Sequence, residues 1–273
     1  MKHCLLLISI LIFSHSAQSR EIKRIVTLAP HATEIAWAAG LGDKLVGVSE
    51  RSDYPSQVTS LPKVSNYKGI NIEKVLSLKP DLVIAWPDGN PQKELDKLKA
   101  MGVNIYYSKT RRLEDIGENI ATLSQYADDP TRGLEAAKDF RSKLHTWRTR
   151  YQDKASVRYF YQLSEKPIIT VGQDRWPSEV FRLCGGVNVF ENSAAPYPQV
   201  SLEQVIIAKP DVIFYSRHAI DHPTQWQSWK EIPAVANDAI WILNSDWLNR
   251  PTPRTLLAIE QICGYLDKVR ESR

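Results

Sequence analysis

The 273-residue sequence lacks any hydrophobic run long enough to cross a membrane. A membrane-spanning helix needs about 18–20 consecutive apolar residues, and the one sustained apolar run, Cys4–Phe13, is too short. The run follows Lys2 and gives way to small residues before Arg20, which is typical of a secretory signal peptide. We therefore expect residues 1–19 to be a signal peptide and the remainder to be a soluble, exported protein.

The sequence also has a small net charge and few cysteines. The 35 Lys and Arg residues against 31 Asp and Glu residues give a net charge of +4, and removing residues 1–19 takes away only Lys2, leaving 34 minus 31, or +3. This excess is too small for a nucleic-acid-binding surface. Only Cys184 and Cys263 lie beyond the signal peptide. An oxidising compartment favours a disulfide between them; two buried free thiols are the alternative.

Catalytic motifs are missing. The sequence has no G-x-S-x-G nucleophile elbow, no H-E-x-x-H zinc helix and no phosphate-binding P-loop, so we predict no catalytic residues and no enzyme activity. His218, Asp221 and His222 are close in sequence, but Pro223 breaks the helical spacing that metal ligation needs, so we predict no metal site. His31 could contact a ligand or its metal, although a histidine hydrogen-bonded within its loop is the favoured interpretation.

The sequence does contain a repeat. Residues 71–86 (NIEKVLSLKPDLVIAW) and 201–216 (SLEQVIIAKPDVIFYS) match at a constant offset of 130. Each copy begins with a helix N-cap residue, carries a glutamate in the first turn (Glu73 or Glu203), stops at Lys-Pro-Asp and continues into an apolar β-type segment. Two lobes built on one plan are the simplest explanation.

Strand and helix signals alternate along both halves, which predicts an α/β fold with helices on the faces of parallel sheets. Residues 49–67 are rich in Ser, Pro and charge and are predicted to be a loop. From Pro130, apolar residues recur every three or four positions through Leu134 to Tyr151, which predicts one long helix between the lobes. The expected organisation is a lobe over 20–127, a linking helix over 128–155 and a second lobe over 156–273.

Similarity between the halves extends beyond the repeated stretch. Residues 25–28 resemble residues 168–171, Thr33-Glu34 resembles Ser178-Glu179, and Gly40 resembles Gly185. We therefore expect the strand at 168–171 to mirror, in the second lobe, the first strand of the first lobe.

Ligands of open α/β sheets bind beyond the carboxyl ends of the strands. Aromatic residues dominate these positions, and for any one of them a role in covering the core is as good an explanation as binding. Five aromatic residues at such positions, on both lobes, favour a binding surface for a large, flat, partly apolar ligand. Charged residues would bind the polar groups at the ligand's edges. The residues at these positions are Tyr67, Trp86, Trp176, Tyr197 and Trp247, with Asp246 and Arg250.

Glu73 and Glu203 have a second interpretation. An acidic residue in the first helical turn is stabilised by the helix dipole by about 0.3–1 kcal/mol, which explains each glutamate separately. Their equivalent positions, one per lobe, would also suit docking onto basic residues of a two-fold symmetric partner.

Several motifs occur in order along the chain: TLAPHATEIAWAAG, GVSERSDYP, GINIEKVLSLKPDLVIAW, CGGVNVF, PQVSLEQVIIAKPDVI and SDWLNRPTPR. With them the chain closely resembles the helix-linked binding proteins of ABC transporters, a family that takes cobalamin (vitamin B12), ferric siderophores and haem. The resemblance implies a periplasmic monomer with a rigid interlobe helix that closes little on its ligand. It further implies that the protein has no cofactor of its own and delivers cobalamin to a membrane permease and ATPase.

The resemblance also implies roles for individual residues. Glu73 and Glu203 match the glutamates that dock onto permease arginines, Cys184 and Cys263 match the family disulfide, and Trp86, Asp246 and Arg250 match ligand contacts. The chain departs from the cobalamin binders at four further positions, with Arg51 in place of Tyr, Tyr67 and Tyr197 in place of Trp, and Ile169 in place of Phe. The predicted ligand-binding residues are Arg51, Tyr67, Trp86, Ile169, Tyr197, Asp246, Trp247 and Arg250.

Arg51 would pair with a phosphate or carboxylate group of the ligand. Such a contact suits cobalamin, haem or an anionic siderophore, so binding of haem or a ferric siderophore is the alternative function. A periplasmic metal-dependent hydrolase is a weaker third hypothesis.

Overall fold

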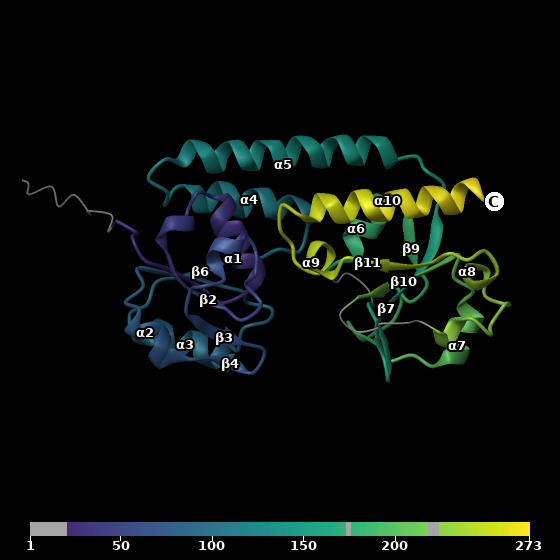
Figure 1. Cartoon of the computed structure of the whole chain (residues 1–273), viewed down its shortest axis with the longest axis horizontal. Coiled ribbons are helices and arrows are strands. Elements are labelled where there is room, and N and C mark those ends of the chain that lie inside the picture. Colours follow the sequence, from purple (N-terminus) through teal and green to yellow (C-terminus); the bar gives the residue numbers. More distant parts are fainter. Residues whose placement is uncertain (1–20, 173–175, 218–223) are drawn as a thin grey trace, which may run out of the picture.

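Two α/β lobes lie side by side beneath one long helix, α5 (Pro130–Tyr151), in the computed structural model (Figure 1). The structure describes residues 21–172, 176–217 and 224–273, so the predicted signal peptide and the segment His218 to His222 lie outside it. None of the helices in these ranges has the length and apolar character needed to cross a bilayer.

The N-terminal lobe is a six-stranded sheet between two helical layers. Its strand order is β4-β3-β2-β1-β5-β6, parallel except for the pairing of β3 with β4. Successive residues of a strand point to opposite faces: Leu82 and Ile84 join the core on one face, whereas Val83 and Ala85 pack on the other. The strands are β1 (Ile25–Thr27), β2 (Leu45–Ser49), β3 (Lys63–Asn66), β4 (Gly69–Ile70), β5 (Leu82–Ala85) and β6 (Ile105–Tyr107). The helices are α1 (Pro30–Ala38), α2 (Ile72–Ser77), α3 (Gln92–Ala100) and α4 (Leu113–Ser124).

The C-terminal lobe repeats the plan. Its sheet has the order β11-β10-β7-β8, with β9 also paired to β7, and β8 is antiparallel to β7. Tyr159 and Tyr161 of β7 face one helical layer, and Phe160 faces the other. The strands are β7 (Val157–Glu165), β8 (Ile168–Thr170), β9 (Gly186–Asn188), β10 (Val212–Ser216) and β11 (Ile240–Leu243). The helices are α6 (Ser178–Leu183), α7 (Leu202–Ala208), α8 (Pro233–Ala236), α9 (Ser245–Leu248) and α10 (Thr255–Glu271).

The shared Lys-Pro-Asp sequence ends a helix and fixes a strand in each lobe. Lys79 and Lys209 adopt left-handed backbone conformations, with φ of 47° and 44°, after which proline cannot continue the helix. In the first lobe, Asp81 Oδ2 accepts hydrogen bonds from the backbone N–H groups of Lys23 and Arg24 at 3.0 Å. In the second lobe, Asp211 Oδ2 accepts one from Arg158 N at 2.7 Å. The aspartate of each repeated stretch therefore fixes the start of a strand inside its sheet, β1 in the first lobe and β7 in the second.

These bonds correct the expected correspondence between the lobes. Arg24 also donates from Nε to the carbonyl of Leu78, and Arg158 donates from Nη2 to that of Ala208, so Arg158 and strand β7 take the place of Arg24 and β1. The strand at 168–171, predicted to mirror β1, instead begins as β8, an antiparallel strand added to β7. Four residues of similar type, three apolar and one threonine, do not specify which strand they pair with.

The predicted loop over 49–67 was also wrong in part. It contains β3 and a short 3-10 helix, Ser56–Val58. A strand of four residues gives too little periodicity to be distinguished from a loop.

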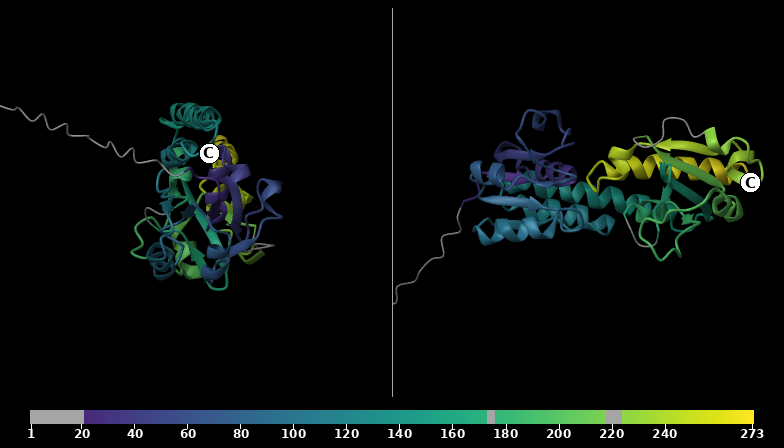
Figure 2. Two further views of the ribbon diagram at one scale, coloured as in Figure 1. Left: turned by 90° about the vertical axis from the view of Figure 1, so that its left-hand side faces the viewer. Right: turned by 90° about the horizontal axis from the view of Figure 1, so that it is seen from below.

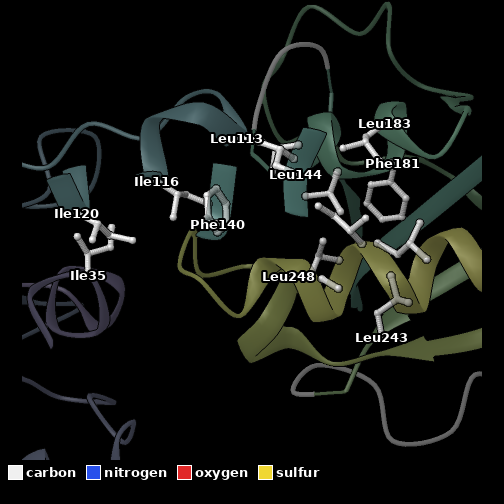
Figure 3. Close-up of a cluster of buried hydrophobic side chains, with 14 of the residues drawn as sticks. Ile35, Leu113, Ile116, Ile120, Phe140, Leu144, Phe181, Leu183, Leu243 and Leu248 are labelled. Carbon is white, nitrogen blue, oxygen red and sulfur yellow. The ribbon is translucent and has the colours of Figure 1, made fainter. Parts of the chain in front are cut away.

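The long helix ties the two lobes into one hydrophobic core. Phe140 and Leu144 of α5 lie between Ile116 and Ile120 of α4 and residues of the second lobe, including Phe181 (Figure 3). The predicted apolar stripe is confirmed over most of its length, but Leu134, at its N-terminal end, is half exposed. Figure 2 shows α5 running along both lobes. The lobes share buried side chains, so they cannot separate without exposing them.

The disulfide between Cys184 and Cys263 is confirmed, and the two cysteines are 79 positions apart in the sequence. It joins the end of α6 to the middle of α10, and both cysteines are fully buried. In the chain-entropy model a loop of this length stabilises the fold by roughly 4–5 kcal/mol.

Candidate functional site

Trp86 follows β5 at the carboxyl end of the first sheet. Its backbone N–H donates to Asn90 Oδ1 at 2.7 Å, while Asn90 Nδ2 donates to the carbonyl of Leu28 at 3.0 Å. The intervening turn allows the indole to fold back, because a Cβ on Gly89 would lie 2.0 Å from the Trp86 ring. The turn thus fixes Trp86 beside β1, with 39% of the residue exposed.

His31 lies beneath Trp86. The two rings meet edge to face with centroids 5.2 Å apart, and His31 is only 5% exposed. Nε2 of His31 is buried without a hydrogen-bond partner in the part of the chain that the structure describes. The sequence favoured a His31 that is hydrogen-bonded within its loop, and for Nε2 that prediction is wrong. An unsatisfied buried polar atom costs about 1–3 kcal/mol, so this one needs an explanation.

Burial, together with the positive charge of Arg250, lowers the pKa of His31 from 6.5 to about 4. The imidazole is consequently neutral throughout the ordinary physiological pH range. A neutral imidazole keeps one nitrogen that donates a hydrogen bond and one that accepts.

Buried hydroxyl groups support the turn after β2. Thr27 Oγ1 and Thr33 Oγ1 are 2.6 Å apart, Thr33 and Ser52 are 2.9 Å apart, and Ser52 and Ser49 are 3.0 Å apart. This chain joins β1, α1 and the turn that carries Arg51, whose φ is 63°. A left-handed arginine is unusual, and such conformations cluster at functional sites. Arg51 is exposed and forms no ion pair with any residue in the described ranges.

A cluster of ion pairs connects the two lobes. Arg254 donates from Nε and Nη2 to the two carboxylate oxygens of Glu34, at 2.8 and 2.6 Å. Arg250 Nη1 lies 2.6 Å from Asp53 Oδ1 and 3.5 Å from Glu34 Oε1, and Arg250 Nη2 lies 3.0 Å from Asp246 Oδ1. Partial burial by itself would raise the pKa of Asp53. The hydrogen bond from Arg250 and the positive charge of Arg250 outweigh burial, so the pKa lies below its ordinary value.

A second cross-lobe contact lies at the start of α4. Glu179 of α6 accepts a hydrogen bond from the backbone N–H of Leu113 at 2.6 Å, and Arg148 of α5 lies 3.0 Å from Glu179 and 2.6 Å from Glu114. Glu34 and Glu179, which the sequence comparison matched to each other, therefore each reach into the opposite lobe. The sequence showed only that the two glutamates occupy similar positions in the two halves, and it did not predict these roles.

The structure places the predicted ligand-binding residues in several settings: loops and strand ends for some, but the middle of β8 for Ile169 and helix α9 for Asp246 and Trp247. It brings Asp246 together with Arg250. Tyr67, in the turn between β3 and β4, is 90% exposed, and Tyr197 is 54% exposed. Ile169 is half buried in β8, where it pairs with Gln199, and Trp247 is half buried in α9 against the shared core. Trp176, named among the aromatic positions, donates from Nε1 to the carbonyl of Leu248 and so positions α9.

A cavity between the lobes' helices does not coincide with these residues. This cavity of about 470 Å³ lies among α1, α5, α10 and the loop at Tyr54, and none of the eight predicted ligand residues lines it. Strand ends, not this cavity, therefore define the candidate site. No group of three or more His, Cys, Asp or Glu side chains within 21–172, 176–217 and 224–273 is placed to hold a metal ion.

Glu73 and Glu203 are exposed near the starts of α2 and α7, which lie at the ends of the two lobes remote from α5 (Figure 1). The predicted N-caps are confirmed, because Asn71 accepts from Lys74 N at 2.9 Å and Ser201 accepts from Gln204 N at 3.3 Å. A hydrogen bond from Ser201 lowers the pKa of Glu203. The helices that carry the two glutamates thus lie on the same side of the molecule (Figure 1).

Comparison with known proteins agrees with this arrangement. The model of a family described as periplasmic binding protein matches residues 25–247. The chain belongs to the periplasmic binding protein family. Within it, the chain is 59% identical over 265 residues to a vitamin B12-binding protein of Vibrio vulnificus, with 97% of each chain covered.

Two further relatives support the assignment. A vitamin B12-binding protein of Yersinia pestis is 43% identical over 267 residues, which cover 97% of this chain and 92% of that protein. The crystal structure of the periplasmic vitamin B12-binding protein BtuF of Vibrio cholerae matches with a TM-score of 0.88 and 59% identity, covering 92% of this chain and 98% of that one. The predicted α/β fold of two lobes on one helix is thereby confirmed.

We expect Glu34→Gln to destabilise this periplasmic binding protein by about 3 kcal/mol, because it leaves the Arg254 guanidinium without a charged partner in a largely buried site. Arg254→Met should destabilise similarly, and the double variant should lose about 1–3 kcal/mol less than the sum. Chemical denaturation of the four proteins measures this coupling. Lys143→Met, which removes an exposed ion pair with Asp139, is the control and should cost less than about 1 kcal/mol. Additive losses would show that the pair is not coupled.

His31 should make stability depend on pH. Between its folded pKa of about 4 and its ordinary value of 6.5, the unfolded chain binds a proton that the folded chain does not. Stability should therefore fall as pH decreases through this window, by up to about 1.4 kcal/mol per pH unit. Denaturation curves at several pH values should show a shallower slope for His31→Phe than for wild type. Identical slopes would mean that His31 titrates normally in the folded protein.

Proposed function

We propose that this protein captures cobalamin in the periplasm and passes it to an ABC importer in the inner membrane. The observation that carries the proposal is high identity to vitamin B12-binding proteins over nearly the whole of both chains. Exposed aromatic side chains support it, because a corrin ring is large, flat and partly apolar. Tyr67 and Trp86 lie after strands of the first lobe, and Tyr197 lies in the loop before α7 of the second. The protein binds and releases its ligand without chemistry.

The proposed binding surface combines residues of both lobes. Tyr67, Trp86 and Arg51 contribute from the first lobe, and Tyr197, Ile169, Asp246, Trp247 and Arg250 contribute from the second. Arg250 is already paired with Asp53 and Asp246, so it holds the lobes and presents few free donors. Arg51 forms no ion pair with the described residues and is available for an anionic group such as the cobalamin phosphate.

The proposed partners are the permease and ATPase subunits of the importer. Glu73 and Glu203 would dock a monomer of this protein onto permease arginines, after export directed by residues 1–19. The position of α2 and α7 on one side of the molecule supports docking through both lobes at once (Figure 1).

Isothermal titration of the mature protein with cyanocobalamin should show one site per chain with micromolar or tighter affinity. Trp86→Ala should weaken binding roughly tenfold, or 1.4 kcal/mol, by removing ring contact. The control Met101→Ala removes an exposed apolar side chain at the end of α3 and should leave affinity unchanged. A protein that binds haem or a ferric siderophore but not cyanocobalamin would contradict the proposal.

Charge reversal at both glutamates, Glu73→Lys with Glu203→Lys, should abolish cobalamin uptake while affinity in solution stays normal. Uptake of labelled cobalamin by cells in which this protein is the only binding component measures the first effect, and calorimetry measures the second. Glu135→Lys with Asp139→Lys makes the same charge change on the exposed face of α5 and should leave uptake intact. Lost affinity in the Glu73/Glu203 variant would assign the glutamates to the fold or the ligand site instead.

A further inference from the structure

His31 combines three features that a structural histidine does not need. Its Nε2 is buried without a partner in the described part of the chain, its ring packs against Trp86, and it follows the carboxyl end of β1, the strand that pairs with both β2 and β5. Ligands of such sheets bind at these strand ends. The unsatisfied nitrogen therefore lies where a bound ligand would approach, covered by a side chain that is itself partly exposed.

We infer that His31 Nε2 forms a hydrogen bond with a carboxamide group at the edge of the bound corrinoid when the Trp86 indole turns aside. This inference rests on the proposed function and adds a residue to its site. It makes Trp86 a cover over a polar contact as well as a surface for the ring.

A carboxamide suits the site better than other groups on the ligand. A neutral imidazole offers either a donor or an acceptor at Nε2, and an amide can satisfy both forms, because its oxygen accepts and its nitrogen donates. A phosphate could serve only as an acceptor. The cobalt ion lies at the centre of the corrin ring, whereas a slender amide-bearing chain at the ring's edge needs little space once Trp86 has turned aside.

The helix itself adds a reason for a neutral, hydrogen-bonding ligand group. His31 is the second residue of α1, where Pro30 has no N–H and Ala29 provides no side-chain cap. The amide dipoles at a helix start favour a partly negative atom such as a carbonyl oxygen. Arg250, whose charge acts on His31, also favours an oxygen acceptor nearby.

The test compares His31→Phe with wild type. Phenylalanine keeps a ring against Trp86 and removes the unsatisfied nitrogen. The ligand-free variant should unfold at the same or a higher denaturant concentration at pH 7, while its affinity for cyanocobalamin should fall about tenfold. His31→Gln, which restores a hydrogen-bonding group, should recover part of the affinity. The control His145→Phe, at an exposed position of α5, should change neither property.

Nitrogen NMR of the histidine side chains gives a direct readout. The His31 Nε2 resonance, identified by its absence in His31→Phe, should shift on addition of cyanocobalamin. Reduced stability of His31→Phe with unchanged affinity would overturn the inference and make His31 structural.

An absorbance experiment separates hydrogen bonding from metal ligation. Aquocobalamin has an exchangeable cobalt ligand, whereas cyanide occupies that position in cyanocobalamin. Equal spectra of aquocobalamin bound to wild type and to His31→Phe are expected, and a shift seen only with wild type would overturn the hydrogen bond in favour of cobalt ligation. Failure of wild type to bind cyanocobalamin would overturn both the function and this contact, whereas equal binding by wild type and His31→Phe would overturn the contact alone.

Discussion

The relation between the two lobes depends on the ion pair of Glu34 with Arg254. The Glu34 side chain is 2% exposed, so a carboxylate there needs its charged partner, and two parallel hydrogen bonds fix the geometry. Arg250 lies four residues earlier and is thereby held within reach of Asp53. Together with the Glu179 contact to α4 and the core around α5, this pair holds the lobes at more than one place. Ligand binding can then involve only small changes in the angle between the lobes, because larger ones would strip a buried carboxylate of its partner.

The two lobes use the same local chemistry for different purposes at their two ends. At the start of each central strand, Lys-Pro-Asp places an aspartate on the strand's backbone, and this contact differs little between Asp81 and Asp211. At the interlobe end the copies diverge, since Glu34 meets an arginine whereas Glu179 meets a backbone N–H and Arg148. The residues that the two lobes share specify the fold of each lobe. The different partners of Glu34 and Glu179 specify how the lobes are joined.

Elements coded by neighbouring residues could be predicted from the sequence. Among pairings between distant residues, the disulfide could be predicted because only two cysteines follow the signal peptide, whereas the ion pairs between the lobes could not. The long helix, the N-caps Asn71 and Ser201, and most strands follow from periodicity and local hydrogen bonding. The partners Glu34 and Arg254 are 220 positions apart, and no spacing rule connects them. A signal was nevertheless present, because Glu34 stands within the apolar segment ATEIAWAA, where an acid must find a buried partner. The unsatisfied nitrogen of His31 had no such signal, since only the three-dimensional surroundings decide whether a histidine is bonded.

The interlobe pairing also shapes which ligands the site can hold. Arg250 and Arg254 are matched by carboxylates of the opposite lobe, so an anionic ligand group that approached them would have to displace an existing partner. Arg51 has no such partner in the described residues, and the hydroxyl chain behind it holds its turn in place. The exposed Tyr67 and Tyr197 can adjust to a ring at little entropic cost, because each has only two rotatable side-chain bonds. A rigid interior of matched charges, adaptable aromatic side chains and Arg51 as an available cation therefore favour a large, mostly neutral ligand that carries an anionic group, as cobalamin does.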